Sequence, residues 1–307
     1  FPALAHWPAA YRGPSLAVDR QAVYLTAGTA CHLLDPQTGT TIHTFKAPLD
    51  QLFPTTTKTD DIEWEYLAVT DRYIIGGLGR PNIKKEWWSK AYPVNQVLLA
   101  VDKQTLQPQW IHEAREGIDS NSIAIQGDKV FVIDGPPRYE SKRLKRRGKT
   151  PAGARTLLAL NLHTGNLVWE TKEIEPAQNS LWVSGGVLVS SINPFSRAME
   201  DPMVAQCGGG ISGYDTENGK KVWDIDDLQT CSPVLVDGTL YLPHAYELRT
   251  GKPVQTQNAI TSKDEPFFLY LAYNAVHGPL DKLAPEKYLK RFDTGNERVD
   301  NFNAYAA

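Results

Sequence analysis

Short stretches in which apolar and polar residues alternate recur along the first four-fifths of the chain. They are rich in Val, Leu, Ile and aromatic residues and end at residues typical of turns, which is the pattern of half-buried β-strands. Five of these stretches contain a turn signal at their centre, so each predicts a β-hairpin. The predicted hairpins lie at residues 15–25, 66–75, 122–132, 181–189 and 233–242.

A second pattern follows each of these hairpins. It consists of a short apolar run, Asp or Asn, two variable residues, Thr or Asn, Gly, and then an aliphatic–aromatic pair. The Asp or Asn starts a tight turn, and the Gly adopts the positive φ that such a turn requires. Each copy therefore predicts another hairpin. The copies are centred on Asp35, Asp102, Asn161 and Asp215, with a shortened copy at 246–254, and their turn glycines include Gly39, Gly165 and Gly219.

Two consecutive hairpins make a four-stranded antiparallel unit, which is the blade of a β-propeller. The sequence thus predicts an all-β fold with about five recognisable blades, the last of them contracted. The turn positions are farther apart than the roughly 40–45 residues of a compact blade. The surplus lies in insertions at residues 76–95 and 135–154, and the second contains the basic run 142–149. That run is interpreted as a solvated loop or, alternatively, as a site for an anionic partner.

The Thr-Gly-x-x-x-Trp hairpins resemble the repeat of pyrroloquinoline-quinone (PQQ) enzymes over about residues 14–256. This family includes quinoprotein dehydrogenases and outer-membrane assembly lipoproteins that bind no quinone. The resemblance implies that Trp110, Trp169 and Trp223 dock one blade on the next, a structural role that the turn glycines share. Their expected role is structural.

The cysteines argue against quinone catalysis in this chain. Dehydrogenases of the family carry a vicinal disulfide beside the cofactor, a Ca²⁺ site and an Asp base, whereas Cys31, Cys207 and Cys231 are all far apart in the sequence. PQQ is therefore not an expected cofactor. Cys207 and Cys231 pair if they lie on neighbouring strands; the alternative is three buried thiols. None of the three has the spacing of a metal ligand.

The pattern changes near residue 256. Residues 257–265 are polar and read as a linker between a repeat domain at 1–256 and a separate segment at 266–307. The run Phe267–Tyr273 is apolar on both faces, as in a central strand of a parallel sheet. A loop at 274–279 follows, and then a short helix over 286–292 that Pro285 would begin.

Residues 264–307 resemble a slice of the type I sulfatases (the arylsulfatase family). The stretches that carry the resemblance are Pro266-Phe-Phe-Leu-Tyr-Leu-Ala-Tyr-Asn-Ala-Val-His277-Gly-Pro-Leu280 and Ala284-Pro-Glu-Lys-Tyr-Leu-Lys-Arg-Phe292. It implies that His277 contacts the sulfate group of a substrate, and Ca²⁺ is implied only for a complete sulfatase. The Cys-x-Pro/Ala-x-Arg element that supplies the family's nucleophile is not in this sequence. The tail strand needs a pairing partner, in the repeat domain, in another chain or in missing sequence.

Charge and hydropathy exclude some partners. With a net charge of −3 and a pI of about 6.2, the chain offers no general electrostatic attraction to nucleic acid. Its longest apolar run is too short to span a bilayer. The chain begins with Phe rather than Met, so we expect either a removed leader or a fragment.

Three functions compete. The favoured one is a non-catalytic scaffold or binding module with a protein or saccharide partner; the alternatives are part of a sulfuric-ester hydrolase and a quinoprotein dehydrogenase. Both family resemblances imply an exported bacterial protein, periplasmic or extracellular.

Overall fold

The computed structural model describes residues 16–53, 62–79, 94–136, 148, 155–174, 178, 180–191, 210–225, 233–242 and 244–254. The chain divides into two units, residues 1–256 and 257–307, and every described residue belongs to the first. Several predicted features lie outside the described residues: the strand at 267–273, the helix at 286–292, His277, Cys207 and Cys231. The predicted division into repeat domain, linker and tail stays a prediction.

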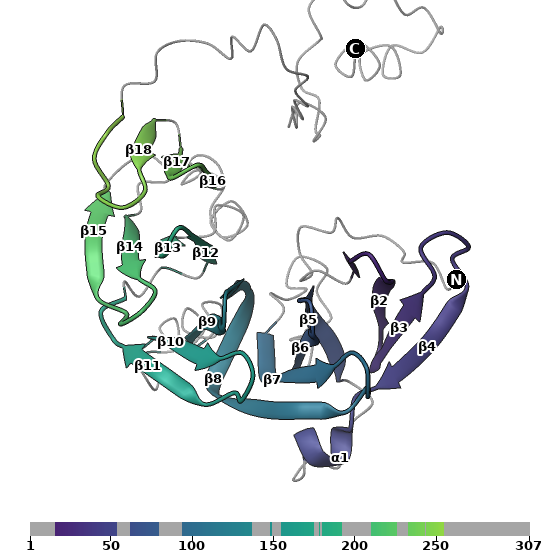
Figure 1. Ribbon diagram of the computed structural model, residues 1–307. Coiled ribbons are helices and arrows are strands. Elements are labelled where there is room, and N and C mark those ends of the chain that lie inside the picture. The colour runs from purple at the N-terminus through teal and green to yellow at the C-terminus, as the bar shows by residue number, and fades with distance from the viewer. Residues whose placement is uncertain are drawn as a thin grey trace, which may run out of the picture. The chain divides into compact units, whose positions relative to one another are not determined.

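The described residues form four antiparallel sheets (Figure 1). The first contains β1 (Leu16–Val18), β2 (Val23–Ala27), β3 (Ala30–Leu34) and β4 (Thr41–Lys46), and is followed by the short helix α1 (Leu49–Leu52). The second contains β5 (Glu63–Val69), β6 (Tyr73–Gly79), β7 (Val94–Asp102), β8 (Pro108–Gln126), β9 (Lys129–Asp134), β10 (Thr156–Asn161) and β11 (Leu167–Thr171). The third contains β12 (Ser180–Ser184), β13 (Val187–Ser191), β14 (Ile211–Asp215) and β15 (Lys221–Ile225). The fourth contains β16 (Val234–Val236), β17 (Thr239–Tyr241) and β18 (Ala245–Glu247).

In every sheet, neighbouring strands are also consecutive in the sequence and run antiparallel. The predicted all-β class with antiparallel pairing is confirmed; the predicted hairpins are formed, except that the shortened copy at 246–254 shows only an isolated bridge between Tyr246 and Pro253. Such up-and-down order is what short turns between strands dictate, because a two- to four-residue connection can join only antiparallel neighbours.

Strand β8 is shared between two units of the second sheet. Its first part pairs with β7, from Val101 opposite Pro108 to Val97 opposite Glu113. Its last part pairs with β9, from Ile123 opposite Val132 to Gln126 opposite Lys129. The second sheet therefore consists of two four-stranded meanders that one strand joins.

We number the meanders in chain order. Meander 1 is β1–β4, meander 2 is β5–β7 with the first part of β8, and meander 3 is the last part of β8 with β9–β11. Meander 4 is β12–β15, and meander 5 is β16–β18, to which an isolated bridge between Tyr246 and Pro253 adds the beginning of a further pairing.

Apolar side chains fill the space between successive meanders. Tyr24 and Leu33 of meander 1 share a cluster with Leu99 of meander 2, and three further clusters join meanders 2 and 3, 3 and 4, and 4 and 5. Strand β7 contributes to two of these clusters, because successive side chains of a strand point to opposite faces. Leu99 and Val101 thus face meander 1, whereas Leu98 and Ala100 face meander 3. Each fully buried side chain of this size stabilises the fold by about 1.5–3 kcal/mol.

Candidate binding surface at the insertion edge

The meanders have two different edges. At one edge lie the tight turns, for example between β1 and β2 and between β3 and β4; we call it the turn edge. At the opposite edge lie the long connections between β6 and β7, β9 and β10, and β13 and β14, which we call the insertion edge. These connections consist of residues 80–93, 135–155 and 192–210, and they leave the same edge because strands alternate in direction along each meander.

The turn between β3 and β4 shows why the repeated sequence folds as it does. Asp35 Oδ1 accepts the backbone N–H groups of Gln37 at 2.9 Å and Thr38 at 2.7 Å. The N–H of Gly39, whose φ is +69°, donates to the Asp35 carbonyl at 2.8 Å. These hydrogen bonds, those of Thr38 first, lower the pKa of Asp35 because they stabilise its charged form. The same bonds recur at Asp102, Asn161 and Asp215.

Three tryptophans, each on the fourth strand of a meander, lie against the turn that Asp, Asn or Glu starts in the next meander. The indole N–H of Trp110 donates to the Leu162 carbonyl at 2.7 Å, and Trp169 and Trp223 donate to the carbonyls of Thr216 at 3.0 Å and Leu248 at 2.8 Å. Each acceptor directly follows the residue that starts the turn of the next meander.

Each ring also covers the glycine of that next turn. A β-carbon on Gly165 would lie 2.8 Å from the Trp110 ring, one on Gly219 would lie 2.5 Å from Trp169, and one on Gly251 would lie 2.8 Å from Trp223. Of the residues predicted to share a docking role, the structure thus brings Trp110 to Gly165 and Trp169 to Gly219. Gly251 was not singled out in the sequence, although it ends the shortened fifth copy. No described residue covers Gly39.

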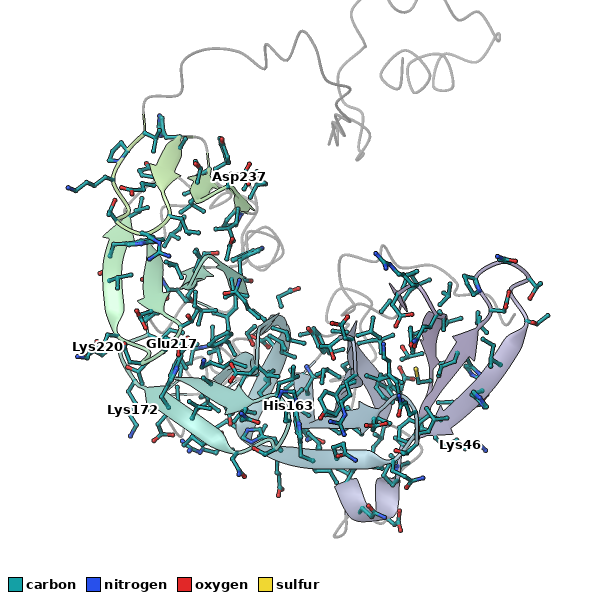
Figure 2. All side chains as sticks on the ribbon, viewed as in Figure 1. Lys46, His163, Lys172, Glu217, Lys220 and Asp237 are labelled. Carbon is teal, nitrogen blue, oxygen red and sulfur yellow. The ribbon has the colours of Figure 1, made fainter. Side chains whose placement is uncertain are left out.

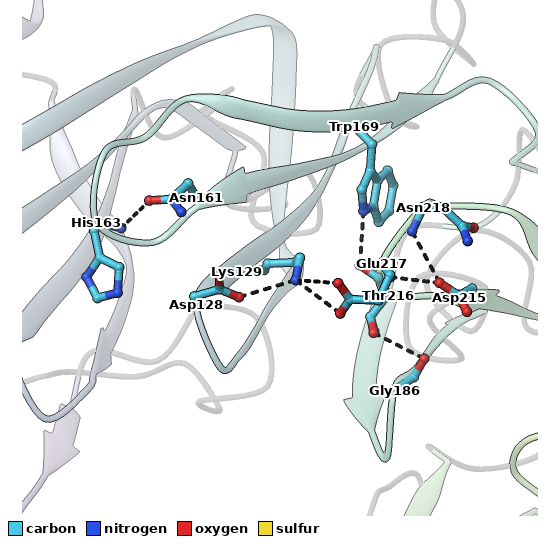
Figure 3. Close-up of polar contacts among 10 residues, drawn as sticks. All are labelled: Asp128, Lys129, Asn161, His163, Trp169, Gly186, Asp215, Thr216, Glu217 and Asn218. Carbon is cyan, nitrogen blue, oxygen red and sulfur yellow. Dashed lines mark hydrogen bonds and ion pairs between the residues drawn. The ribbon is translucent and has the colours of Figure 1, made fainter.

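Polar contacts also join successive meanders at the turn edge. Lys103 donates to Asp19 at 2.7 Å, and the Tyr73 hydroxyl lies 3.3 Å from Nδ1 of His163. Figure 3 shows the third, in which Lys129 bridges Asp128 of its own meander and Glu217 of the next. Hydrogen bonding to Glu217 is the main reason that the pKa of Lys129 is raised. The turn edge is therefore largely occupied by contacts between meanders.

The insertion edge differs, because polar side chains are buried beneath it. Asn95, at the start of β7, is fully buried and donates to the Ile118 carbonyl at 2.8 Å and to Ser120 Oγ at 3.1 Å. Ser120 in turn donates to the Glu65 carbonyl at 2.7 Å. The other amide atom, Asn95 Oδ1, has no hydrogen-bond partner among the described residues.

The polar row continues between meanders 3 and 4. The guanidinium of Arg155 donates to the carbonyls of Gln178 and Pro136, both at 3.2 Å. The fully buried Gln178 side chain donates to the Gly210 carbonyl at 3.0 Å and to Ser212 Oγ at 2.9 Å.

Besides Asn95 Oδ1, two more atoms of this row lack partners among the described residues. They are Gln178 Oε1 and the Oγ of Ser190, which lies opposite Ser212 in the β13–β14 register. We call Asn95, Ser120, Arg155, Gln178, Ser190 and Ser212 the polar row. An unmet buried polar atom costs about 1–3 kcal/mol, so the row retains hydrogen-bonding capacity at the insertion edge.

Titratable side chains were compared over the part of the chain that the structure describes. No group of three or more His, Cys, Asp or Glu side chains there is arranged to hold a metal ion. Cys31 is fully buried outside any disulfide, and burial raises the pKa of its thiol to about 12, which makes it a poor nucleophile at neutral pH. Among the described residues, no helix is long and apolar enough to cross a membrane.

The chain matches a protein-family model over much of its repeated β structure. Residues 94–262 match the family model described as outer membrane protein assembly factor BamB (PQQ_2). The chain belongs to this family. The matched residues run from β7 to the end of the described chain, so they include both edges of meanders 3, 4 and 5. The resemblance to the PQQ-type propeller repeat that the hairpins predicted is confirmed.

Two solved structures are similar at low identity. BamB from Moraxella catarrhalis is 14% identical with a TM-score of 0.46, over 80% of this chain and 57% of that chain. The computationally designed Ika4 protein is 12% identical with a TM-score of 0.40, over 65% of this chain and 88% of that one. The chain thus spans somewhat more than half the length of the BamB structure.

The sulfatase resemblance is confirmed as a partial one. The Uncharacterized sulfatase YdeN of Escherichia coli (strain K12) is 56% identical over 55 residues, which are 18% of this chain and 10% of the sulfatase. Nothing about a complete sulfatase site follows from so short a match.

Proposed function

We propose that this chain is a non-catalytic β-propeller module of an exported protein, and that it binds a partner at its insertion edge. In this proposal the five meanders are blades, the last of them contracted, and Trp110, Trp169 and Trp223 hold them together through the turn edge. The observation that carries the proposal is the polar row, with buried acceptor atoms beneath the edge from which the three long connections leave.

An extended polypeptide fits the chemistry of this edge. The amide oxygens of Asn95 and Gln178 need N–H or O–H donors, and a polypeptide backbone supplies N–H groups at regular spacing. Membership of a family described as an outer membrane protein assembly factor supports the same choice of partner. A periplasmic or cell-surface location is part of the proposal.

The test compares the two edges. The purified chain would be immobilised and titrated with an unfolded outer-membrane β-barrel polypeptide held in dilute urea. In one variant a short Gly-Ser linker replaces residues 192–209, and in the matched control Lys220 on the turn edge is changed to Glu (Figure 2). We expect the linker variant to bind at least about tenfold more weakly, with the control unchanged.

Circular dichroism would first show that both variants keep the β-sheet spectrum. Equal affinity of the linker variant and the parent chain would contradict the proposal, as would loss of binding in the Lys220→Glu control. Binding of a sulfated polysaccharide, but not of the polypeptide, would replace the proposed partner by a saccharide.

A second candidate function rests on the 55-residue match to a sulfatase. We propose that residues 266–307 derive from a sulfatase domain in which His277 contacts the sulfate and Ca²⁺ completes the site. Without the Cys-x-Pro/Ala-x-Arg element, this chain is expected to hydrolyse no aryl sulfate in the presence of Ca²⁺. Turnover that a His277→Asn variant abolishes would overturn that expectation and make the hydrolase the primary function.

A further inference from the structure

Successive meanders pack through the same pair of faces at each described junction. We call the face that meets the preceding meander the front face, and the face that meets the following meander the back face. Leu67 of β5 and Ile74 of β6 lie on the front face of meander 2 and are buried in the cluster that it shares with meander 1. The equivalent buried residues are Ile123 and Val130 in meander 3, and Leu181 and Leu188 in meander 4.

The front face of meander 1 has the same positions, but they are open. In the pairing of the first two strands, Leu16 and Val23 correspond to Leu67 and Ile74 of meander 2. Leu16 and Val18 are 54% and 57% exposed. On β2 and β3 the pairing register adds the following residues to this face: Val23, Leu25, Ala27, Ala30, His32 and Leu34. On β1–β3 the face is therefore apolar except for one histidine.

Meander 5 leaves the opposite face open. Leu235 and Leu240 lie on its front face and pack in the cluster shared with meander 4. Since neighbouring side chains of a strand point to opposite faces, Val234, Val236 and Tyr241 lie on the back face. They are 55%, 47% and 42% exposed. The back face of meander 4, by contrast, is buried against meander 5.

The two open faces are of complementary kinds. At every junction among the described residues, the back face of one meander covers the front face of the next. Within one chain the open pair does not meet, because no described cluster contains both meander 1 and meander 5 and their side chains stay exposed. Stacks of repeats ordinarily end in polar outer faces that keep them soluble, and neither end of this stack has one. The face that fits each open end is therefore the other open end, on a second molecule.

We infer that two copies of this chain join head to tail, with the back face of meander 5 in one copy covering the front face of meander 1 in the other. The contact continues the packing that joins meanders within each chain. Because it pairs two different faces, it is heterologous and leads to a closed ring or an open row of copies. This interaction surface is independent of the partner proposed for the insertion edge.

Sedimentation velocity of the complete chain over a range of micromolar concentrations tests the association. We expect the average mass to rise with concentration above that of one chain. Val18→Lys on the front face and Val236→Lys on the back face each place a charge in the contact, and each should weaken association at least about tenfold. The matched control is Val222→Lys, because Val222 is also 47% exposed but lies on the outer strand β15, on neither open face. It should associate like the parent chain.

A mixture of the two variants distinguishes head-to-tail packing from a symmetric contact. Val18→Lys keeps an intact back face, and Val236→Lys keeps an intact front face. Each variant alone should be monomeric, whereas an equimolar mixture should form dimers with one intact junction and nothing larger. If each face instead packed against its own kind, each variant would still dimerise alone through its intact face.

Three outcomes would overturn the inference: a parent chain that stays monomeric, a variant that associates alone as strongly as the parent, or a mixture that does not associate. Closure of meander 5 on meander 1 within the same chain would give a monomeric parent whose thermal stability both variants lower. Circular dichroism would first show that the variants keep the β-sheet spectrum. If Val236→Lys unfolds, Tyr241→Lys on the same face takes its place.

Discussion

The junction between meanders 1 and 2 differs from the three junctions that follow it. In the later three, a tryptophan on the outer strand covers the glycine of the next turn. In the first, His43 has the corresponding register and the next turn carries Leu106, while an ion pair between Asp19 and Lys103 joins the two meanders.

The residue opposite the tryptophan position, on the neighbouring strand, also differs between the first junction and the later three. Trp110 lies opposite Ala100, Trp169 opposite Ala159 and Trp223 opposite Gly213, so the indole always has a small neighbour on the adjacent strand. Opposite His43 is Leu33.

Three positions therefore differ between the first junction and the later three: the tryptophan position, the residue opposite it, and the glycine position of the next turn. A hollow of about 460 Å³, lined partly by Lys46 and Leu106, remains beside the first one. The comparison teaches that one fold can join its meanders either by a ring on a glycine or by aliphatic side chains with a partly buried ion pair.

Removal of a docked ring should have the largest effect on stability. Trp223→Ala removes both the buried indole and its hydrogen bond to Leu248, and we expect a loss of about 4 kcal/mol in the free energy of unfolding. Urea unfolding followed by circular dichroism measures it. Trp223→Phe keeps most of the packing and should lose less than half as much; an equal loss in both variants would show that packing of the ring is not the main contribution.

A methyl group beneath a ring should be nearly as harmful. Gly219→Ala places a β-carbon 2.5 Å from the Trp169 ring at a φ of +72°, so overpacking adds to backbone strain, for an expected loss of about 3 kcal/mol. The control Gly238→Ala has a φ of +75° but nothing within 4 Å, and should lose only about 1 kcal/mol. Similar losses would mean that strain alone explains the glycine.

The ion pair of the first junction should matter less and should depend on pH. Burial favours a higher pKa for Asp19, but hydrogen bonds from Lys103 and from the backbone of Ala22 and Gln21 outweigh it and lower the pKa to about 2. Because this pKa is below its ordinary value of 3.8, the contribution to stability is present above about pH 4 and is lost as the pH falls towards 2.

Lys103→Met should therefore lower the free energy of unfolding by about 2 kcal/mol at pH 7. Urea titrations of parent and variant at pH 7 and at pH 2.5 should show this difference shrinking at the lower pH. A difference that is the same at both values would assign the effect of Lys103 to packing rather than to the ion pair.

The smallest effect is expected at Leu106. Leu106→Gly relieves a strained positive φ by about 1 kcal/mol but loses partial packing against the cluster between meanders 1 and 2, so the net change should stay below about 1 kcal/mol. Gly165→Leu, the reverse change beneath Trp110, should cost several times more. Equal effects of the two substitutions would remove the distinction between the junctions.

Local patterns predicted the repeated turns well. The Asp or Asn, the following Thr and the Gly lie within five residues, and their hydrogen bonds are formed inside the turn, so no distant residue is needed to specify them. For Trp110 and Trp169 the repeat predicted a role in docking one blade on the next, which stays a prediction, and it did not indicate which glycine each ring covers.

The polar row could not be predicted, because its contacts join residues that are far apart in the sequence. Gln178 meets Ser212, 34 residues away, and Asn95 meets Ser120, 25 residues away, only after the strands that carry them have paired. The available signal was weak: Asn95 and Ser190 are polar residues within strands that are otherwise buried and mostly apolar.

Apolar residues on both faces of a strand proved a less specific sign of a parallel sheet than expected. Strand β6 is buried along its whole length, with apolar residues on both faces, although its sheet is antiparallel. Inner strands of stacked meanders thus read like strands of a parallel sheet. Phe267–Tyr273 lies outside the described residues, so its parallel-sheet interpretation stays a prediction, and the family resemblance is its better support.

Strand β8 limits where proteases can cleave the chain between meanders 2 and 3. Proteases cleave segments that can leave the fold and enter an active site in extended form, and such segments are found mainly in exposed loops. From Trp110 to Gln126 the backbone is part of one strand, which pairs with β7 at 110–113 and 118–119 and with β9 at Ile118 and at 123–126. We therefore expect limited proteolysis not to separate meanders 2 and 3 by a cut within β8.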